Sequence, residues 1–326
     1  MLEAIGAFLD VHKGCVLWKP FVFSHGGCSS LNSMGDHLAI KPVGTHVSKW
    51  GEGPRFWNNS LLYVDIEGHS IIRLCPDSHN EDVWDVGERI GAVTPTHDGG
   101  LLCAGDSGIY SFRLQSGEKK VLVDPESDKR PDNRFNDGMC DPSGRFWAGT
   151  ISTTKLVGNA SLYMFDREGQ LHKKIPRVTN SNGICWSEDA SLMYYIDTPT
   201  KKVMAYPFEN ETGNLGIPKV VIDTQSADVE GSPDGMAIDI DGNLWIAMCH
   251  GGAVIQVETQ TGKVVKKISF PCVETTACTF GGAHYDRLFV TTGLHKTLRE
   301  PDAGKVFVID GLSTHGFPVV PYKGSI

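Results

Sequence analysis

Short runs of aromatic and β-branched residues recur along the chain, and each run is entered through a turn rich in Gly, Asp or Asn. This alternation of turns and short apolar runs predicts β-strands. Six copies align on a large apolar residue, at intervals of 40, 45, 46, 52 and 44 residues, and these anchors are Leu61, Leu101, Phe146, Leu192, Leu244 and Leu288. Repeats of this length made of short strands are typical of propeller blades. The pattern therefore predicts an all-β protein with the fold of a six-bladed β-propeller.

Further strands are expected where a blade needs them, over residues 70–74, 202–206 and 253–257, each after an anchor strand and a turn. Amphipathic helices are not expected, because 37 Gly and 17 Pro interrupt most helical windows. We assign residues 48–326 to the propeller, as the catalytic domain. Residues 1–47 form an N-terminal extension that either packs on the domain or is partly disordered, and residues 15–23 within it are a candidate strand.

Size and charge narrow the range of partners. The chain of 326 residues can bury an ample core, and its 30 basic and 39 acidic side chains give a net charge of -9. No block of basic residues offers a surface for nucleic acid, and no apolar run approaches the roughly 20 residues of a membrane helix. An acid in the first ten residues argues against a secretion signal, so we expect a cytoplasmic protein.

Nine cysteines are scattered along the chain and are never spaced Cys-x-x-Cys. An odd number without metal-ligand spacing favours buried free thiols in a reducing compartment over a disulfide framework or a zinc site.

Candidate chemistry lies in two stretches with the same layout, 134–148 and 229–247: a polar residue beside Gly, an Asp-rich turn, then an aromatic strand. In a propeller, the loops that enter the inner strands converge at one mouth of the central channel. The polar residues in these loops are Glu52, Asn136, Asp137, Asn182 and Asp234. All but Asn136 adjoin a glycine, which allows a close backbone approach while the side chain points inward.

Carboxylates and carboxamides gathered at a narrow mouth would repel one another or lose hydration unless a cation joined them. Such oxygen ligands suit one divalent cation, Ca²⁺, Mg²⁺ or Mn²⁺, or Zn²⁺ through the acidic side chains. The alternative is that each Asn-Gly or Asp-Gly is only a turn. Residues 239–243 do not begin a calcium-binding EF-hand loop, because the required Gly and Glu are replaced by Leu244 and His250.

Five ordered motifs, at 51–54, 134–150, 181–183, 233–235 and 275–282, resemble the SMP-30/gluconolactonase/luciferin-regenerating enzyme family, regucalcin-like members included. The resemblance runs from about residue 48 to the C-terminus. It implies a six-bladed propeller with one divalent cation in its channel. By position, Glu52, Asn182 and Asp234 match the family's metal ligands, and Arg134 and Asn136 match its substrate contacts.

The resemblance also implies the hydrolysis of a small-molecule sugar lactone such as gluconolactone. The bound metal would polarise the carbonyl and activate water, and Asp234 would act as both ligand and general base. Vertebrate members carry a glutamate soon after the Ala-Gly-Thr motif, whereas residues 151–158 here contain no acid, which leaves the identity of the lactone open. The alternatives are a calcium-binding regulatory protein without catalysis and a propeller that acts on phosphotriesters. A third, a strictosidine-synthase-like propeller, would not need this set of ligands.

Overall fold

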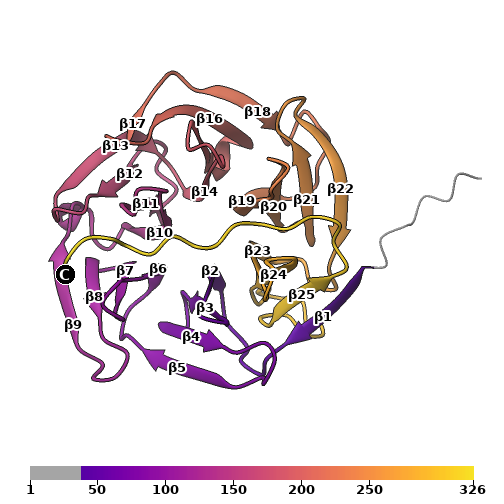
Figure 1. Ribbon diagram of the computed structural model, residues 1–326, viewed down its shortest axis with the longest axis horizontal. Helices are drawn as coiled ribbons and strands as arrows, with labels where there is room; N and C mark the ends of the chain where they lie inside the picture. Colours follow the sequence, from indigo (N-terminus) through magenta and orange to yellow (C-terminus); the bar gives the residue numbers. More distant parts are fainter. Residues whose placement is uncertain (1–37) are drawn as a thin grey trace, which may run out of the picture. The chain divides into compact units, whose positions relative to one another are not determined.

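Six antiparallel sheets surround a central channel in the computed structural model, which describes residues 38–326 (Figure 1). Each sheet is one blade. The predicted six-bladed β-propeller is therefore confirmed, and the part of the chain that the structure describes has two short 3-10 helices and no α-helix. No helix among residues 38–326 is long and apolar enough to cross a membrane.

The first three blades follow one another along the chain. Blade 1 consists of β2 (Gly51–Trp57), β3 (Ser60–Asp65), β4 (Ser70–Leu74) and β5 (Glu81–Asp85). Blade 2 consists of β6 (Ile90–Pro95), β7 (Leu101–Gly105), β8 (Gly108–Phe112) and β9 (Lys119–Val123). The 3-10 helix η1 (Ser127–Lys129) leads to blade 3, which consists of β10 (Asn133–Cys140), β11 (Phe146–Ser152), β12 (Ala160–Phe165) and β13 (Leu171–Val178).

The remaining blades complete the ring. Blade 4 consists of β14 (Ser181–Trp186), β15 (Leu192–Asp197), β16 (Lys202–Glu209) and β18 (Lys219–Asp223), with η2 (Thr198–Thr200) before β16 and the two-residue β17 (Asn214–Leu215) paired to its end. Blade 5 consists of β19 (Ser232–Ile238), β20 (Leu244–Cys249), β21 (Ala253–Glu258) and β22 (Lys263–Ser269). Blade 6 consists of β23 (Thr275–Gly281), β24 (Arg287–Thr292), β25 (Val306–Asp310) and β1 (Ala39–Val43).

Every anchor of the sequence repeat lies in the second strand of its blade. These strands are buried along almost their whole length, because neighbouring blades pack on both faces. A strand covered on both faces reads as a continuous apolar run, which explains why the repeat is visible in the sequence. The outermost strands are largely exposed and several are rich in lysine, as in Lys119–Val123 and Lys263–Ser269, so they carry no comparable signal.

Blade 6 is closed by the two ends of the described chain. Its outermost strand, β1, lies within the segment 1–47 that the sequence analysis set apart, and it pairs antiparallel with β25. The described part of that segment thus contributes a strand to the propeller. The candidate strand at residues 15–23 lies outside the described residues.

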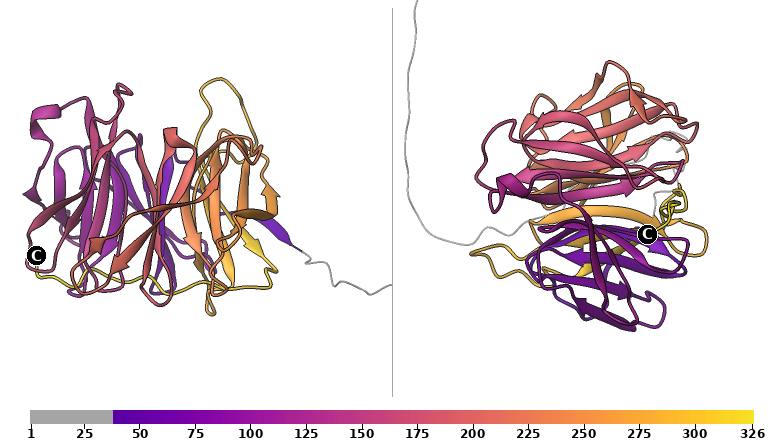
Figure 2. Two further views of the ribbon diagram at one scale, coloured as in Figure 1. Left: turned by 90° about the horizontal axis from the view of Figure 1, so that it is seen from above. Right: turned by 90° about the vertical axis from the view of Figure 1, so that its left-hand side faces the viewer.

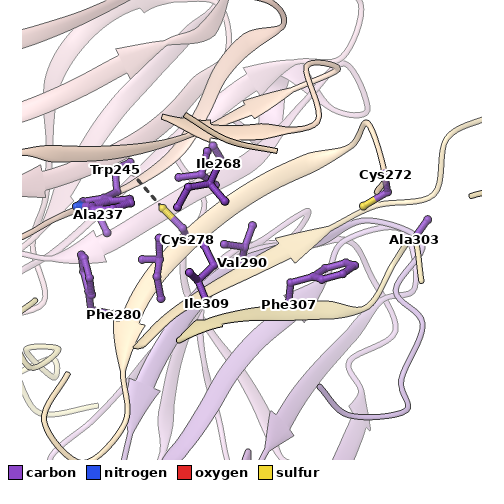
Figure 3. Close-up of a cluster of buried hydrophobic side chains, with 13 residues drawn as sticks. Ala237, Trp245, Ile268, Cys272, Cys278, Phe280, Val290, Ala303, Phe307 and Ile309 are labelled. Atoms are coloured by element: carbon purple, nitrogen blue, oxygen red, sulfur yellow. Dashed lines mark hydrogen bonds between the residues drawn. The ribbon is translucent and has the colours of Figure 1, made fainter. Parts of the chain in front are cut away.

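Apolar side chains fill the spaces between adjacent blades. Figure 3 shows one such cluster, in which Trp245 and Ile268 of blade 5 meet Phe280 and Val290 of blade 6. The Cys278 thiol in this cluster donates to the Trp245 carbonyl oxygen, 3.2 Å away. All seven cysteines of the described chain are free thiols, and six of them are buried. This matches the prediction of buried free thiols for that part of the chain.

An aspartate organises the turn before the second strand in blades 3 and 5. Asp239 is fully buried and accepts hydrogen bonds from the amides of Asp241 and Asn243 and from the Trp245 indole, at 3.1, 2.8 and 2.9 Å. Asp141 holds the Trp147 indole in the same way at 2.9 Å. Asp239 therefore stabilises a turn, in agreement with the rejection of an EF-hand loop.

Replacing Asp239 with alanine should destabilise the propeller by about 3 kcal/mol, because the buried Trp245 indole and two partly buried backbone amides would lose their acceptor at once. Asp241→Ala is the matched control: that side chain is exposed, and its removal should change the free energy of unfolding by less than about 0.5 kcal/mol. Urea denaturation followed by tryptophan fluorescence measures both. Equal effects for the two variants would contradict the role given to Asp239.

The C-terminal tail covers one end of the channel. It runs across the ring below the inner strands, as Figures 1 and 2 show. Gly316 forms a bridge with Asp239 of blade 5, and Tyr322 pairs with Thr96 of blade 2 and stacks on Phe165 of blade 3. Residues 317–320 line an apolar cavity together with the C-terminal ends of inner strands. The opposite mouth, where the inner strands begin, is the end that carries the polar residues.

Candidate metal centre

The inner strand of every blade is irregular near its N-terminal end. In each, the pairing with the second strand shifts register, between Glu52 and Arg55, Ile90 and Ala92, Phe135 and Asp137, Asn182 and Ile184, Pro233 and Met236, and Thr275 and Ala277. Such bulges bend a strand and redirect a side chain. Four of the six lie at the predicted site residues Glu52, Asn136, Asn182 and Asp234, so the bulges turn these polar groups toward one mouth.

Glycines allow the inner strands to approach one another at this mouth. A Cβ on Gly183 would lie 2.6 Å from the backbone oxygen of Asp234, and a Cβ on Gly91 would lie 2.6 Å from Asn136 Cα. Any side chain at these positions would push neighbouring blades apart. Gly183, which adjoins Asn182, was predicted to permit such an approach and does so, whereas Gly91 was not predicted.

The structure brings all five predicted site residues together. Glu52, Arg134, Asn136, Asn182 and Asp234 line a single pocket of about 190 Å³. All of them except the partly exposed Arg134 are buried. They come from blades 1, 3, 4 and 5, which are far apart in the chain.

A chain of hydrogen bonds fixes the orientation of the two carboxamides. Asn136 Nδ2 donates to the Ser181 carbonyl at 2.9 Å and lies 3.3 Å from Asn182 Oδ1. Asn182 Nδ2 donates to Thr198 Oγ1 at 2.9 Å, and Thr198 Oγ1 in turn donates to the Pro233 carbonyl at 2.9 Å. This chain links blade 4 to the residue before Asp234, so the oxygens of Asn182 and Asp234 are held in a defined relation.

Arg134 provides the positive charge at the edge of the pocket. Its Nη1 donates to Asn136 Oδ1 and to the Phe135 carbonyl, both at 2.9 Å. Burial, aided by the neighbouring charge of Arg89, lowers the pKa of Arg134 to about 10. The guanidinium therefore remains charged at neutral pH and orients Asn136 from one side.

Three carboxyl groups share this buried mouth. Burial, followed by the charges of Asp234 and Asp137, raises the pKa of Glu52 well above its usual value. The pKa of Asp234 is raised well above its usual value by burial and by Asp137. Burial also raises the pKa of Asp137, although Arg55 opposes the shift. Like charges that cannot be solvated are stabilised when a cation lies between them.

The donor set fits such a cation. Asp234 Oδ1 is buried without any hydrogen-bond partner, which is rare for a carboxylate oxygen. The oxygens of Glu52, Asn182 and Asp234 are hard ligands of the type that calcium and magnesium prefer. Sequence, geometry and electrostatics thus agree on one candidate cation site formed by these three residues.

Some polar residues of the mouth have other roles or were not predicted. Arg55, which was not predicted, lies 3.7 Å from Asp137 and donates to the Gly138 carbonyl at 2.5 Å, so Asp137 has a fixed positive neighbour inside the channel. Cys249 and His250 also line the pocket. Their only sequence signal was their position at the end of a strong second strand, which did not by itself indicate a site.

The fold and the pocket define a six-bladed propeller with an oxygen-donor site at one mouth of its channel. The sequence model of the SMP-30/Gluconolactonase/LRE-like region matches residues 50–294. Regucalcin of Danio rerio is 34% identical, with 88% of this chain and 99% of the relative covered. The chain therefore belongs to the SMP-30/gluconolactonase/LRE-like family.

Two further relatives extend the comparison. A Bacillus subtilis protein named "Putative sugar lactone lactonase YvrE" is 33% identical, with 85% of this chain and 96% of the relative covered. The crystal structure of a calcium-binding protein, regucalcin, from Agrobacterium tumefaciens matches with a TM-score of 0.82 and 27% identity, over 88% of this chain and 98% of that chain.

Proposed function

We propose that the protein is a divalent-metal-dependent hydrolase that opens sugar lactones. The observation that carries the proposal is the buried Asp234 carboxylate with an unpartnered oxygen, grouped with Glu52 and Asn182 in one pocket. Family membership and the sugar-lactone name of the Bacillus subtilis relative support the substrate class.

Glu52, Asn182 and Asp234 would hold the cation. When bound, such an ion supplies Lewis-acid polarisation of the lactone carbonyl and lowers the pKa of water. Its charge would also offset the burial and repulsion that raise the pKa of Asp234 in the metal-free protein, so that Asp234 is ionised at neutral pH.

Asp234 then serves as the general base. It accepts a proton from the attacking water while the water oxygen bonds to the carbonyl carbon. The ring ester bond breaks, and the proton passes to the departing ring oxygen, giving the open hydroxy acid. The Asn182–Thr198–Pro233 hydrogen bonds hold the backbone beside Asp234 in place during these steps.

Arg134 and Asn136 would bind the hydroxyl groups or ring oxygen of the substrate. The wall next to them contains Ile151. Residues 151–158 bring no carboxylate to the pocket. We therefore propose that the preferred lactone has a less polar edge on this side than a lactone that is bound by a glutamate at this position.

Hydrolysis of a panel of sugar lactones with Ca²⁺, Zn²⁺, Mn²⁺ or Mg²⁺ tests the function directly. Turnover that requires the ion is expected. Tight calcium binding without turnover of any lactone would instead favour a calcium-binding regulatory protein without catalysis. The calcium-binding regucalcin structure has the same fold and a related sequence, which supports this alternative. Turnover of phosphotriesters but of no lactone would favour the alternative of a propeller that acts on phosphotriesters.

Replacing Arg134 with alanine should reduce kcat/KM by on the order of a hundredfold while leaving the metal in place, because the substrate would lose its fixed orientation. Arg89→Ala is the control: Arg89 lies near Arg134 but pairs with Asp106 and does not line the pocket. Steady-state kinetics and elemental analysis measure both variants. Loss of metal from Arg134→Ala would assign Arg134 to the integrity of the site and not to substrate binding.

A further inference from the structure

A second cluster of metal-ligand side chains lies at the rim of the same pocket, between blades 5 and 6. Cys249 ends β20, His250 follows it in the turn to β21, and Glu274 immediately precedes β23. Cys249 and Glu274 form an isolated antiparallel bridge, which brings the two segments together. None of these residues belongs to the candidate site of Glu52, Asn182 and Asp234.

The three potential ligand atoms converge. Glu274 Oε2 lies 2.7 Å from His250 Nδ1 and 3.4 Å from Cys249 Sγ, and all three atoms lie within 4.8 Å of one another. Zinc binds nitrogen, oxygen and sulfur at about 2.0 to 2.3 Å, so its ligand atoms are separated by roughly 3 to 4 Å. Only small adjustments would place an ion between these atoms.

Glu274 is a buried carboxylate whose side chain is 4% exposed. The ion pairs that the structure shows for it are with histidines: His250, and His295, whose Nε2 lies 3.9 Å from Oε1. The hydrogen bond with Glu274 raises the pKa of His250, so a metal ion bound between these two side chains would replace the imidazole proton.

Burial and neighbouring charges shift the pKa values of two of these groups. Burial would raise the pKa of Glu274, but the hydrogen bond and charge of His250 lower it below the usual value. Burial, with the nearby carboxylates of Asp234 and Glu274, raises the pKa of the Cys249 thiol well above the usual value. A metal ion bound by this thiol would displace the thiol proton.

We propose that Cys249, His250 and Glu274 form a second metal site, one that selects a thiophilic ion of the zinc type. A thiolate, an imidazole and a carboxylate are zinc ligands, and three of them leave a fourth position for water or for His295. The first site offers only oxygen atoms and suits a hard ion. The two sites therefore differ in ligand chemistry and take different metals.

Cobalt substitution tests this site without any activity measurement. The protein is first saturated with Ca²⁺ and then titrated with Co²⁺, which gives an intense sulfur-to-cobalt charge-transfer absorption in the near ultraviolet when a thiolate is bound. We expect this absorption to saturate at one equivalent and to disappear on addition of one equivalent of Zn²⁺. Elemental analysis after dialysis against zinc-free calcium buffer should retain one zinc per chain.

Variants assign the ligands. Cys249→Ser should abolish the charge-transfer absorption. His250→Asn should weaken cobalt binding while preserving the turn, because His250 has a φ of +63° and asparagine tolerates that conformation. Cys75→Ser is the matched control for adventitious thiol binding, since Cys75 is the described cysteine that is not fully buried. Cys15→Ser and Cys28→Ser, outside the described residues, complete the controls.

The outcomes separate this site from the proposed lactonase. Glu52→Gln should impair hydrolysis but keep the thiolate absorption. A protein that shows the absorption but opens no lactone would support the second site and contradict the proposed function. Absence of the absorption in folded protein, or its persistence in Cys249→Ser, would overturn the second site whether or not lactones are hydrolysed.

Discussion

Asp234→Asn should lower the rate of lactone hydrolysis by about a hundredfold to ten-thousandfold, the range that a positioned general base contributes. Asparagine keeps the size of the side chain and one oxygen ligand but cannot accept the proton of the attacking water. The loss should appear in kcat, because the proton is transferred in the chemical step. Steady-state kinetics on the lactone with the highest turnover, at saturating divalent ion, measures the effect.

Metal occupancy has to be followed in the same samples. Asp234→Asn should retain a measurable fraction of the ion by elemental analysis, since Glu52 and Asn182 are unchanged. Asn182→Ala is the matched control, because it removes a neutral ligand and no candidate base, so high metal concentrations should restore much of its activity. If metal-loaded Asp234→Asn hydrolyses lactones at the parental rate, another group is the base.

In the metal-free protein, the stability contributed by the three carboxyl groups of the mouth should fall as the pH rises above about 4, contrary to the usual behaviour of folded carboxylates. The pKa values of Glu52, Asp137 and Asp234 are raised in the folded state, mainly by burial. The folded state then binds more protons than the unfolded state, so their contribution is complete below the unfolded pKa and is lost as the pH rises through the folded pKa.

A divalent ion should reverse this loss near neutral pH. An ion present at a hundred times its dissociation constant stabilises the folded state by about 2.7 kcal/mol. Thermal unfolding in chelator and in excess calcium, at several pH values between 4 and 8, measures both effects. Glu52→Gln should flatten the pH dependence of the metal-free protein, whereas Glu67→Gln, an acid outside this group of three, should leave it unchanged. Carboxyl groups with lowered pKa values, such as Asp65 and Asp98, act in the opposite direction, so the test is the difference between the two variants. Equal pH dependences of Glu52→Gln and Glu67→Gln would contradict the site electrostatics.

Much of the fold could be predicted from the sequence, for a physical reason. The second strand of each blade is covered on both faces, so runs such as Leu244–Cys249 must be apolar, and their spacing reports the number of blades. The outermost strands were not predicted, because exposed strands such as Glu81–Asp85 tolerate polar residues and lack a clear period. Closure of blade 6 by Ala39–Val43 likewise has no local signal, since it depends on a partner more than 260 residues away.

The candidate site, like the fold, could be predicted only in part from the sequence. Glu52, Asn182 and Asp234 belong to the polar residues that adjoin a glycine at the entrance to an inner strand, a group that also includes Asp137. The family resemblance, and not this pattern, assigned the metal to these three. Their grouping in one pocket follows from ring closure, which the repeat already implied.

Contacts between segments that share no motif could be determined only from the tertiary structure. Arg55 beside Asp137, and Cys249 and His250 beside Glu274, are brought together across blade boundaries. In the sequence, Cys249 was one of nine cysteines without metal-ligand spacing, and a zinc site was disfavoured on that ground. Ligand spacing is informative only when one loop supplies the ligands. Here two strand ends from adjacent blades supply them, so the packing of the blades determines the cluster.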